Sequence, residues 1–217
     1  MKNTLVIGST GLVGSHLVRE LEAHAGVETI RLLVRKSGVA AGKKTEVIVS
    51  DFSKESLSEA MQGISAVFIC LGTTIIKAGS IQAMEAIDRD LPIQIASFAS
   101  QNGVKQLAAV SSVGANAKSG NYYLRIKGEM EQGIQKIGFE NLALVRPSLI
   151  LGDRNEKRFG ESFAKVMMRA AGFLFVGKLR KYKAIHARTI ARAMIHILEQ
   201  NNQKIVFESD TLQVLGQ

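Results

Sequence analysis

The sequence of 217 residues predicts an α/β fold, in which a doubly wound parallel sheet is flanked by helices. Two observations carry this prediction. Short apolar runs typical of buried strands alternate five times with segments of helical periodicity. In addition, the sequence shows no internal repeat, linker or low-complexity tract, which favours a single domain over residues 1–217.

The first strand, expected at residues 4–9, leads into a glycine-rich turn. Gly8, Gly11 and Gly14 follow one another at intervals of three, and a helix is expected at residues 12–24. Glycine lets the backbone approach a ligand closely, and the N-terminus of the next helix presents free N–H groups to a phosphate. The turn therefore predicts a dinucleotide site in a Rossmann fold. The commoner spacing is G-x-G-x-x-G, and an ordinary tight turn is the alternative.

The other elements follow from the same two patterns. Ser53 is expected to cap a helix, and Pro92 to kink or restart one, because proline has no N–H to donate. Further strands are expected at residues 29–34, 46–50, 66–71, 106–110, 142–145 and 204–208. Further helices are expected at residues 54–62, at 80–101, from 121 onward and at 187–199.

The end of the second predicted strand distinguishes between two dinucleotides. In an NAD site, an acidic residue near this position accepts hydrogen bonds from the adenosine ribose. Here Arg35 and Lys36 take its place, and two cations suit a 2′-phosphate better than a carboxylate would. The sequence thus predicts NADP(H) in preference to NAD(H), with a solvent-facing basic strand end as the alternative. Asp51, which follows the third strand, is either a contact of the adenine amino group or a simple turn acid.

A tyrosine and a lysine stand four residues apart at the start of a predicted helix. Tyr123 and Lys127 therefore share one helix face, and Ser112 lies just beyond the fifth predicted strand, at the edge where a nicotinamide would lie. The ammonium, helped by the cationic nicotinamide of the oxidised cofactor, would lower the pKa of the phenol. The phenol could then protonate a carbonyl oxygen while the serine hydroxyl hydrogen-bonds that oxygen. Lys127 is also placed to hold the nicotinamide ribose. A Tyr-x-x-x-Lys pair arises easily by chance, so it is the context that indicates catalysis.

The combination of these motifs resembles the short-chain dehydrogenases/reductases of the atypical or extended type. More narrowly, it is similar to the Tat-interacting oxidoreductase branch and its bacterial relatives. The resemblance covers most of the chain. The matching motifs are Gly8–Gly14, Asp51, Ser111-Ser112-Val113-Gly114-Ala115-Asn116, Tyr123-x-x-x-Lys127 with Gly128-Glu129, Arg146-Pro147 and Asp153-Arg154.

This resemblance implies a Rossmann domain that binds NADP and a Ser/Tyr/Lys catalytic set. The set is carried over to Ser112, Tyr123 and Lys127, and Ser111 is the alternative serine if the strand ends one residue earlier. In relatives, the backbone after the proline that corresponds to Pro147 lines the nicotinamide amide. The expected cofactor contacts are Gly8, Ser9, Thr10, Gly11, Leu12, Val13, Arg35, Lys36, Asp51, Phe52, Leu71, Gly72, Thr73, Tyr123, Lys127, Pro147, Ser148 and Ile150.

The C-terminal part departs from the extended members of the family, which usually carry a larger substrate domain. Here a small cap is expected at about 153–203, and the whole net charge of +9 falls within residues 154–192. This segment would attract an anionic small-molecule substrate, with Arg154 and Tyr122 as candidate contacts, and a solvated basic face is the alternative. Nucleic acid is not an expected partner, because the cations are not interleaved with a pattern of aromatic residues.

Composition and residue spacing limit the expected location of the protein and the kinds of site it can carry. The single cysteine, Cys70, excludes a disulfide within the chain and favours a reducing cytosol, so a cytoplasmic location is expected. The first apolar run is broken too early for an export signal, and no stretch of about 18 apolar residues predicts a membrane span. No His/Cys spacing indicates a metal site.

Three classes of function remain open. The leading interpretation is an NADP-dependent oxidoreductase that transfers hydride to or from a small carbonyl or alcohol substrate. The first alternative is an NADP(H)-binding regulatory protein with little turnover, which acts through a partner. The second is an epimerase-type isomerase. The sequence indicates neither the identity of the substrate nor the oligomeric state.

Overall fold

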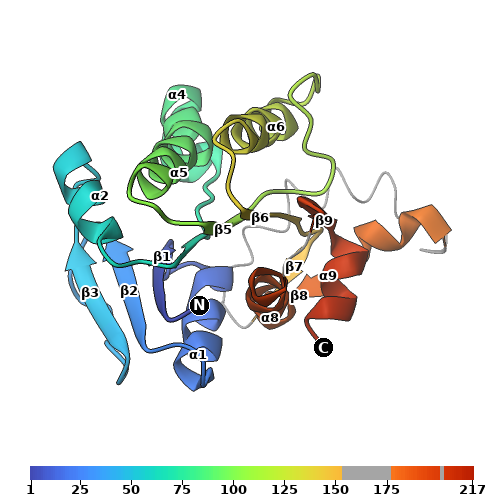
Figure 1. The fold of residues 1–217 in the computed structure, drawn as a ribbon. Coiled ribbons are helices and arrows are strands. Elements are labelled where there is room, and N and C mark those ends of the chain that lie inside the picture. The colour runs from blue at the N-terminus through green and yellow to red at the C-terminus, as the bar shows by residue number, and fades with distance from the viewer. Residues whose placement is uncertain (153–176, 201–202) are drawn as a thin grey trace.

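The computed structural model describes residues 1–152, 177–200 and 203–217, and it confirms the α/β fold (Figure 1). Within these ranges, seven parallel strands form one sheet in the order β3-β2-β1-β4-β5-β6-β9. This is the strand order of a Rossmann sheet with one further strand beside β6. The strands are β1 (Asn3–Ile7), β2 (Thr29–Val34), β3 (Thr45–Val49), β4 (Ala66–Ile69), β5 (Gln106–Val110), β6 (Asn141–Arg146) and β9 (Val206–Glu208).

The central strands form because continuous apolar runs can be buried on both faces of a parallel sheet. Successive side chains of a strand point to opposite faces. Val6 of β1 and Phe68 of β4 therefore join the apolar core on one side of the sheet, and Leu5 and Val67 join the core on the other. All four side chains are completely buried. The sheet is thus the middle layer of three.

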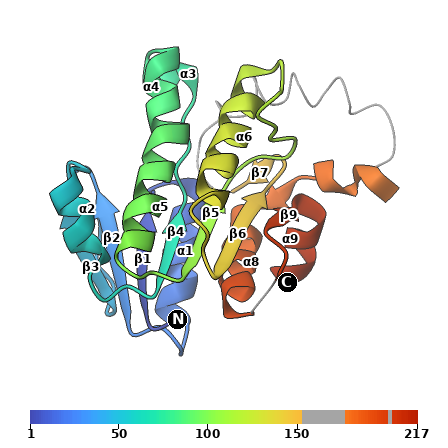
Figure 2. The same cartoon turned by 45° about the horizontal axis from the view of Figure 1, so that its top comes forward.

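Helices cover both faces of the sheet (Figures 1 and 2). On one face α1 packs against α8, which also contacts α9, and on the other face α5 packs against α2 and α6. The helices are α1 (Leu12–Ala23), α2 (Lys54–Met61), α3 (Ile75–Ala78), α4 (Ile81–Glu85), α5 (Leu91–Gln101), α6 (Tyr122–Gln135), α8 (Ala187–Glu199) and α9 (Ser209–Leu215).

Several short elements were not expected from the sequence. They are α3, α9, a 3-10 turn at Gly177–Tyr182, and a small parallel sheet of β7 (Ile150–Leu151) with β8 (Ile185–His186). Elements this short contain too few residues for a hydrophobic period to show. The expected cap of α2 is confirmed, because the Ser53 hydroxyl accepts a hydrogen bond from the Ser56 amide at 3.3 Å.

The helical stretch expected at residues 80–101 is interrupted just before Pro92, as the proline predicts. There α4 runs through a π-helical turn, η1 (Ala86–Asp90), into α5. Pro92 has no N–H to donate to the carbonyl of Asp88, four residues earlier, and its ring crowds that carbonyl. A wider turn relieves this crowding, and single π turns inside helices are frequent at functional sites.

Helix α8 is not part of a cap. The range expected for the cap, residues 153–203, includes α8, but this helix lies on the sheet beside α1. Ile190 and Met194 of α8 are completely buried in the core that they share with α1. The prediction is therefore wrong for this helix, because its apolar face completes the cover of the sheet. Residues 153–176 of the expected cap lie outside the described residues.

Charged side chains join α8 to α1. One carboxylate oxygen of Glu20 accepts a hydrogen bond from Arg188 Nε at 2.6 Å, and the other accepts one from Arg192 Nε at 3.0 Å. Burial disfavours the ionised form of Glu20, but the two guanidinium groups outweigh it and hold the pKa of this carboxyl below its usual value. Two cations of the basic segment are therefore engaged within the fold.

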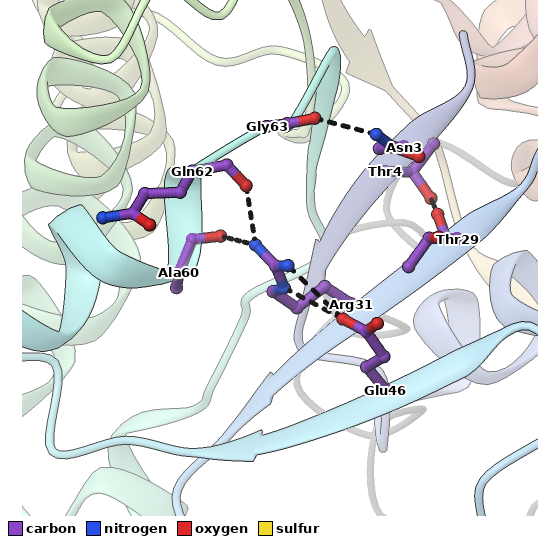
Figure 3. Close-up of polar contacts among 8 residues, drawn as sticks. All are labelled: Asn3, Thr4, Thr29, Arg31, Glu46, Ala60, Gln62 and Gly63. Carbon is purple, nitrogen blue, oxygen red and sulfur yellow. Dashed lines mark hydrogen bonds and ion pairs between the residues drawn. The ribbon is translucent and has the colours of Figure 1, made fainter.

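An arginine with a side chain only 19% exposed connects α2 to the sheet (Figure 3). Arg31 of β2 donates from Nη1 to the carbonyl oxygens of Ala60 at 2.9 Å and Gln62 at 3.0 Å, at the C-terminal end of α2. Its Nη2 lies 3.3 Å from the Glu46 carboxylate of β3. The last carbonyls of a helix have no partner within the helix, so a cation there satisfies them and also complements the helix dipole.

Arg31→Met is expected to lower the free energy of unfolding by about 1.5–3 kcal/mol, because two carbonyls at the end of α2 lose a charged donor. Glu46→Gln removes only the exposed partner and should lower it by less than about 1 kcal/mol. Urea denaturation of both variants and the parent measures the two losses. Equal losses would show that the ion pair, and not the contact with α2, stabilises this corner.

Candidate functional site

The candidate site lies at the carboxyl edge of the sheet, where β1 and β4 end side by side. Ile7 pairs with Ile69 in the last register of these two parallel strands. The chain leaves β1 toward α1 on one face of the sheet, and it leaves β4 toward α5 on the other face (Figure 2). Open α/β sheets bind ligands at such a switch point.

The glycine turn approaches the neighbouring backbone very closely. Gly8 has a φ of 82°, and a Cβ on it would lie 2.5 Å from the carbonyl oxygen of Cys70, at the end of β4. A Cβ on Gly14 would overlap the carbonyl oxygen of Gly8, and one on Gly11 would lie 3.1 Å from the same oxygen. All three glycines therefore occupy positions where a larger residue would force the backbone apart.

The same turn leaves polar groups available to a ligand. Gly11 is the N-cap of α1, and without a side chain it leaves the first amides of the helix uncapped. The Ser9 hydroxyl is buried and has no hydrogen-bond partner among the described residues. A buried hydroxyl without a partner is unfavourable unless a ligand or water satisfies it. The turn thus fits the pyrophosphate of a dinucleotide.

Helix α6 brings the predicted tyrosine and lysine to this edge. Tyr123 and Lys127 lie one turn apart, and the Tyr123 phenol lies near enough to the hydroxyl of Ser112, which follows β5, for the serine to affect the pKa of the phenol. Gly128 permits this approach, because a Cβ there would overlap the backbone of Asn116 in the loop after β5. Tyr123 remains partly exposed, whereas Lys127 and Ser112 are buried. The structure therefore brings the three residues of the expected set together.

The alternative serine has a different environment. The Ser111 hydroxyl is buried and has no hydrogen-bond partner among the described residues. Its amide donates to the carbonyl of Val145 at 2.7 Å, which continues the pairing of β5 with β6. Of the two serines, Ser112 is the one whose hydroxyl meets the phenol.

The residues around Tyr123 raise the pKa of its phenol. Withdrawal from water raises this pKa above that of a free tyrosine, and the negative charge of Asp88 raises it further. The Lys127 ammonium and the nearby Ser112 hydroxyl lower it but do not outweigh the two. At neutral pH the phenol is therefore protonated, in the form that can donate a proton.

Asp88 is the residue of this edge that the sequence reasoning missed. It lies on η1 with a side chain that is 0% exposed, and its Oδ1 is 2.7 Å from Nζ of Lys127. Its Oδ2 accepts a hydrogen bond from the Thr73 amide at 2.9 Å. Pro92 was the available signal, since it predicts an irregular turn nearby. The sequence did not show which side chain that turn would direct inward.

The residues expected at the adenosine end lie at the ends of β2 and β3. Arg35 and Lys36 follow β2 directly and are both exposed. Asp51 follows β3 and accepts a hydrogen bond from the Ser53 amide at 2.8 Å, which lowers the pKa of its carboxyl. One of its oxygens thus serves as the turn acid that the sequence offered as an alternative. Phe52 has a φ of 62°, a strained conformation for a bulky residue that tends to occur at functional sites.

The contacts expected after β6 lie on the segment that leads into β7. The carbonyl of Pro147 accepts a hydrogen bond from the Val113 amide at 3.0 Å. Ser148 is buried, and its hydroxyl donates to the carbonyl of Lys183. This side chain is therefore engaged within the fold.

The remaining predicted residues divide between the two turns and α6. Leu12 opens α1 and lies against the segment after β7, since a Cβ on Gly152 would be 2.5 Å from Leu12 Cδ1. Tyr122 stands on α6, with the Arg125 guanidinium 5.1 Å from its ring centre. Arg154, the other candidate substrate contact, lies outside the described residues. Thr10 lies in the turn after β1, Val13 lies in the first turn of α1, and Leu71, Gly72 and Thr73 lie in the turn after β4.

In the part of the chain that the structure describes, no group of His, Cys, Asp or Glu side chains is arranged to hold a metal ion. None of the helices there has both the length and the apolar character to cross a membrane.

The chain is similar in sequence to known proteins. Residues 8–201 match the sequence pattern of a family described as NAD(P)H-binding. The mitochondrial protein fmp52 of Emericella nidulans is 37% identical over 179 residues, which are 79% of this chain and 77% of the relative. The mitochondrial protein fmp52-1 of Aspergillus terreus is 35% identical over 223 residues, which cover 100% of this chain and 96% of the relative.

Solved structures show the same fold. The UDP-N-acetylglucosamine 4-epimerase of Bacillus cereus has a TM-score of 0.70 at 17% identity, and the match covers 95% of this chain and 77% of that one. MoeE5, solved in complex with UDP-glucose and NAD, also has a TM-score of 0.70 at 17% identity, covering 94% of this chain and 74% of that one. At such identities the likeness concerns the fold alone.

The sequence relatives correct the expected location. A cytoplasmic protein is predicted from the single cysteine, but the relatives are named as mitochondrial proteins, so this prediction is wrong. The reasoning failed because a chain without disulfides indicates a reducing environment and does not identify a particular compartment.

Gly14→Ala is expected to weaken NADPH binding by about tenfold or more, the equivalent of about 1.4 kcal/mol, because the new methyl group overlaps the Gly8 carbonyl. In an ordinary helix interior, replacing glycine by alanine would stabilise the helix by about 1 kcal/mol. Weaker NADPH binding by Gly14→Ala would therefore identify the close contact as its cause. Fluorescence titration with NADPH measures the change. Gly120→Ala is the control, since a Cβ there meets nothing within 4 Å, and unchanged binding by Gly14→Ala would contradict the assignment of this turn.

Proposed function

We propose that this chain, which belongs to the NAD(P)H-binding family matched over residues 8–201, is an NADP(H)-dependent oxidoreductase acting on a small carbonyl or alcohol substrate. One observation supports the proposal most directly. Ser112, Tyr123 and Lys127 lie near one another at the sheet edge that carries the glycine turn. A phenol, a hydroxyl and an ammonium near one another are groups that can transfer a proton to a carbonyl oxygen.

The residues that would hold the dinucleotide follow the sheet edge in order. Arg35 and Lys36 stand after β2, the glycine turn after β1, and the Ser112 loop after β5. Since β2, β1, β4 and β5 are consecutive neighbours in the sheet, an extended dinucleotide laid across the edge would meet each of these groups in turn. The unpartnered Ser9 hydroxyl lies in the middle of this path.

The bound dinucleotide would supply the hydride for reduction or accept it in oxidation, and residues of this chain would manage the proton. Tyr123 is protonated at neutral pH and would donate its phenolic proton to the carbonyl oxygen of the substrate. Ser112 would orient that oxygen through a hydrogen bond. Lys127 would stabilise the phenolate that remains, because a neighbouring cation favours the charged form.

Within this proposal NADP(H) is favoured over NAD(H). Arg35 and Lys36 are exposed, and neither forms an ion pair with a residue in the described ranges. A guanidinium and an ammonium would pair with a 2′-phosphate, whereas the carboxylate of an NAD site would repel it. The basic segment at residues 154–192 would favour an anionic small molecule as the substrate, although Arg188 and Arg192 are already engaged by Glu20.

A regulatory protein that binds NADP(H) with little turnover is the alternative that one observation favours. The raised pKa of Tyr123 keeps the phenolate scarce, which would slow the oxidation of an alcohol. The motifs around Ser112 and Lys127 favour a place near the Tat-interacting oxidoreductase branch in either case. Epimerase activity gains no separate support, because the similarity to epimerase structures concerns the fold alone.

Tyr123→Phe is expected to lower turnover by about 10²–10⁴-fold while NADPH affinity stays unchanged, because the substitution removes only the proton donor. The loss of NADPH absorbance in the presence of a panel of small aldehydes and ketones measures turnover. Tyr182→Phe is the control, because it removes a phenol from the 3-10 turn at Gly177–Tyr182 and not from α6. Equal rates in the two variants would contradict the assignment of Tyr123, and a parent chain that binds NADPH without turning over any carbonyl in the panel would support the regulatory alternative.

The double variant Arg35→Gln/Lys36→Gln is expected to bind NADPH about 10–100-fold more weakly, because each charged hydrogen bond contributes about 1.5–3 kcal/mol and part of that is regained from water. NADH lacks the 2′-phosphate and serves as the internal control, with no change in affinity expected. Calorimetric titration with both nucleotides measures the difference. A parent chain with equal affinity for the two would refute the preference for NADP(H).

A further inference from the structure

We infer that Asp88 is a positioning residue of the Ser112, Tyr123 and Lys127 site, whose carboxylate keeps the Lys127 side chain a charged ammonium and fixes it against the turn after β4. The catalytic meaning of this inference rests on the proposed function. The charge pair can be tested without cofactor or substrate.

Both charges of the pair lie inside the protein. The side chains of Asp88 and Lys127 are 0% and 2% exposed, and Oδ1 lies 2.7 Å from Nζ. A charge buried without a partner is so unfavourable that the group usually becomes neutral instead. Among the described residues, Oδ1 has no other hydrogen-bonding partner. Each group therefore depends on the other to remain ionised.

The pair is also attached to the turn that faces the glycine turn. Asp88 Oδ2 accepts a hydrogen bond from the Thr73 amide at 2.9 Å, and Lys127 Nζ donates to the carbonyl of Leu71 at 3.5 Å. Asp88 reaches this position from the π-helical turn η1, which precedes Pro92. The carboxylate thus has two separable tasks. One oxygen holds the turn, and the other carries the charge that faces the ammonium.

Asp88 acts on the protons of both catalytic groups. Burial by itself would lower the pKa of Lys127, but Asp88, Tyr123 and Glu131 together raise it above its ordinary value. Asp88 also adds to the effect of burial in raising the pKa of Tyr123. Its charge therefore retains one proton on the lysine and one on the tyrosine, which is the state of the site that can protonate a carbonyl oxygen.

The other charged groups near the pair are engaged elsewhere. Glu131, one turn further along α6, accepts a hydrogen bond from Arg146 of β6 at 2.8 Å. Arg89 of η1 pairs with Asp90 at 2.7 Å and with Glu129 of α6 at 3.0 Å. The turn after β4 presents the Leu71 carbonyl and the Thr73 amide to the pair, and neither is charged. Asp88 is therefore the main source of negative charge at the ammonium.

An NMR titration of the ligand-free chain, labelled with carbon-13 at lysine Cε and tyrosine Cζ, tests the inference. In the parent, Lys127 should titrate above the value of about 10.4 that an exposed lysine shows. Asp88→Asn keeps an acceptor for the Thr73 amide but removes the charge, so the Lys127 and Tyr123 pair should lose its first proton at a pH about 1–3 units lower. Lys127→Arg and Tyr123→Phe assign the two signals.

Asp90→Asn is the matched control, because it removes the same charge two residues away, from a side chain that is 57% exposed and paired with Arg89. It should leave both titrations unchanged. A merely structural Asp88 would lower the thermal stability of Asp88→Asn without moving either titration, and that result would overturn the inference. If Asp88→Asn does not fold, a parent Lys127 that titrates below an exposed lysine would overturn it equally.

Turnover then separates this inference from the proposed function. If the chain is an oxidoreductase, the alkaline limb of its pH profile for NADPH oxidation should move to lower pH in Asp88→Asn by the same amount as the NMR titration. If Tyr123→Phe leaves turnover unchanged, the oxidoreductase assignment fails. The NMR titration would still report whether Asp88 holds the two protons.

Discussion

The contact between the backbones at the ends of β1 and β4 determines the geometry of the whole carboxyl edge. Gly8 lies so close to the carbonyl of Cys70 that a side chain would force the two strand ends apart, and a Cβ on Gly14 would overlap the carbonyl oxygen of Gly8. Since the chain leaves the two strands toward opposite faces of the sheet, this narrow junction is also the switch point of the fold. The uncapped amides of α1 lie beside this junction, as does the Ser9 hydroxyl, which has no hydrogen-bond partner among the described residues.

Burial decides the chemistry of the groups beside this junction. Removal from water disfavours the charged form of a lysine, an aspartate and a tyrosine alike. Lys127 stays charged because the Asp88 carboxylate lies 2.7 Å away, whereas burial and the charge of Asp88 together disfavour the phenolate of Tyr123, which keeps its proton. The same balance operates at Glu20, where two arginines outweigh a smaller loss of hydration. In each case the outcome follows from which opposite charge the fold supplies.

Much of the fold could be predicted from local patterns. The strands at β1, β4 and β6 are continuous apolar runs, and a parallel sheet is the structure that buries such runs on both faces. Tyr123 and Lys127 could be paired from their spacing because an α-helix places residues four apart on one face. The short elements α3, α9, β7 and β8 could not be predicted in this way, and α8 was placed in a cap although its apolar face belongs to the core.

The sequence by itself was enough to indicate the parallel sheet, the glycine turn and the pairing of the tyrosine with the lysine. Each of these is indicated by a pattern among residues that are close together in the chain. The partners of charged groups depended on contacts across long stretches of chain. Asp88 is 39 residues from Lys127 in sequence, and it meets the lysine only because a π-helical turn on one helix faces α6. The protonation states of Lys127 and Tyr123 are consequently a property of the packed structure, since desolvation and charge pairing arise only when distant segments come together.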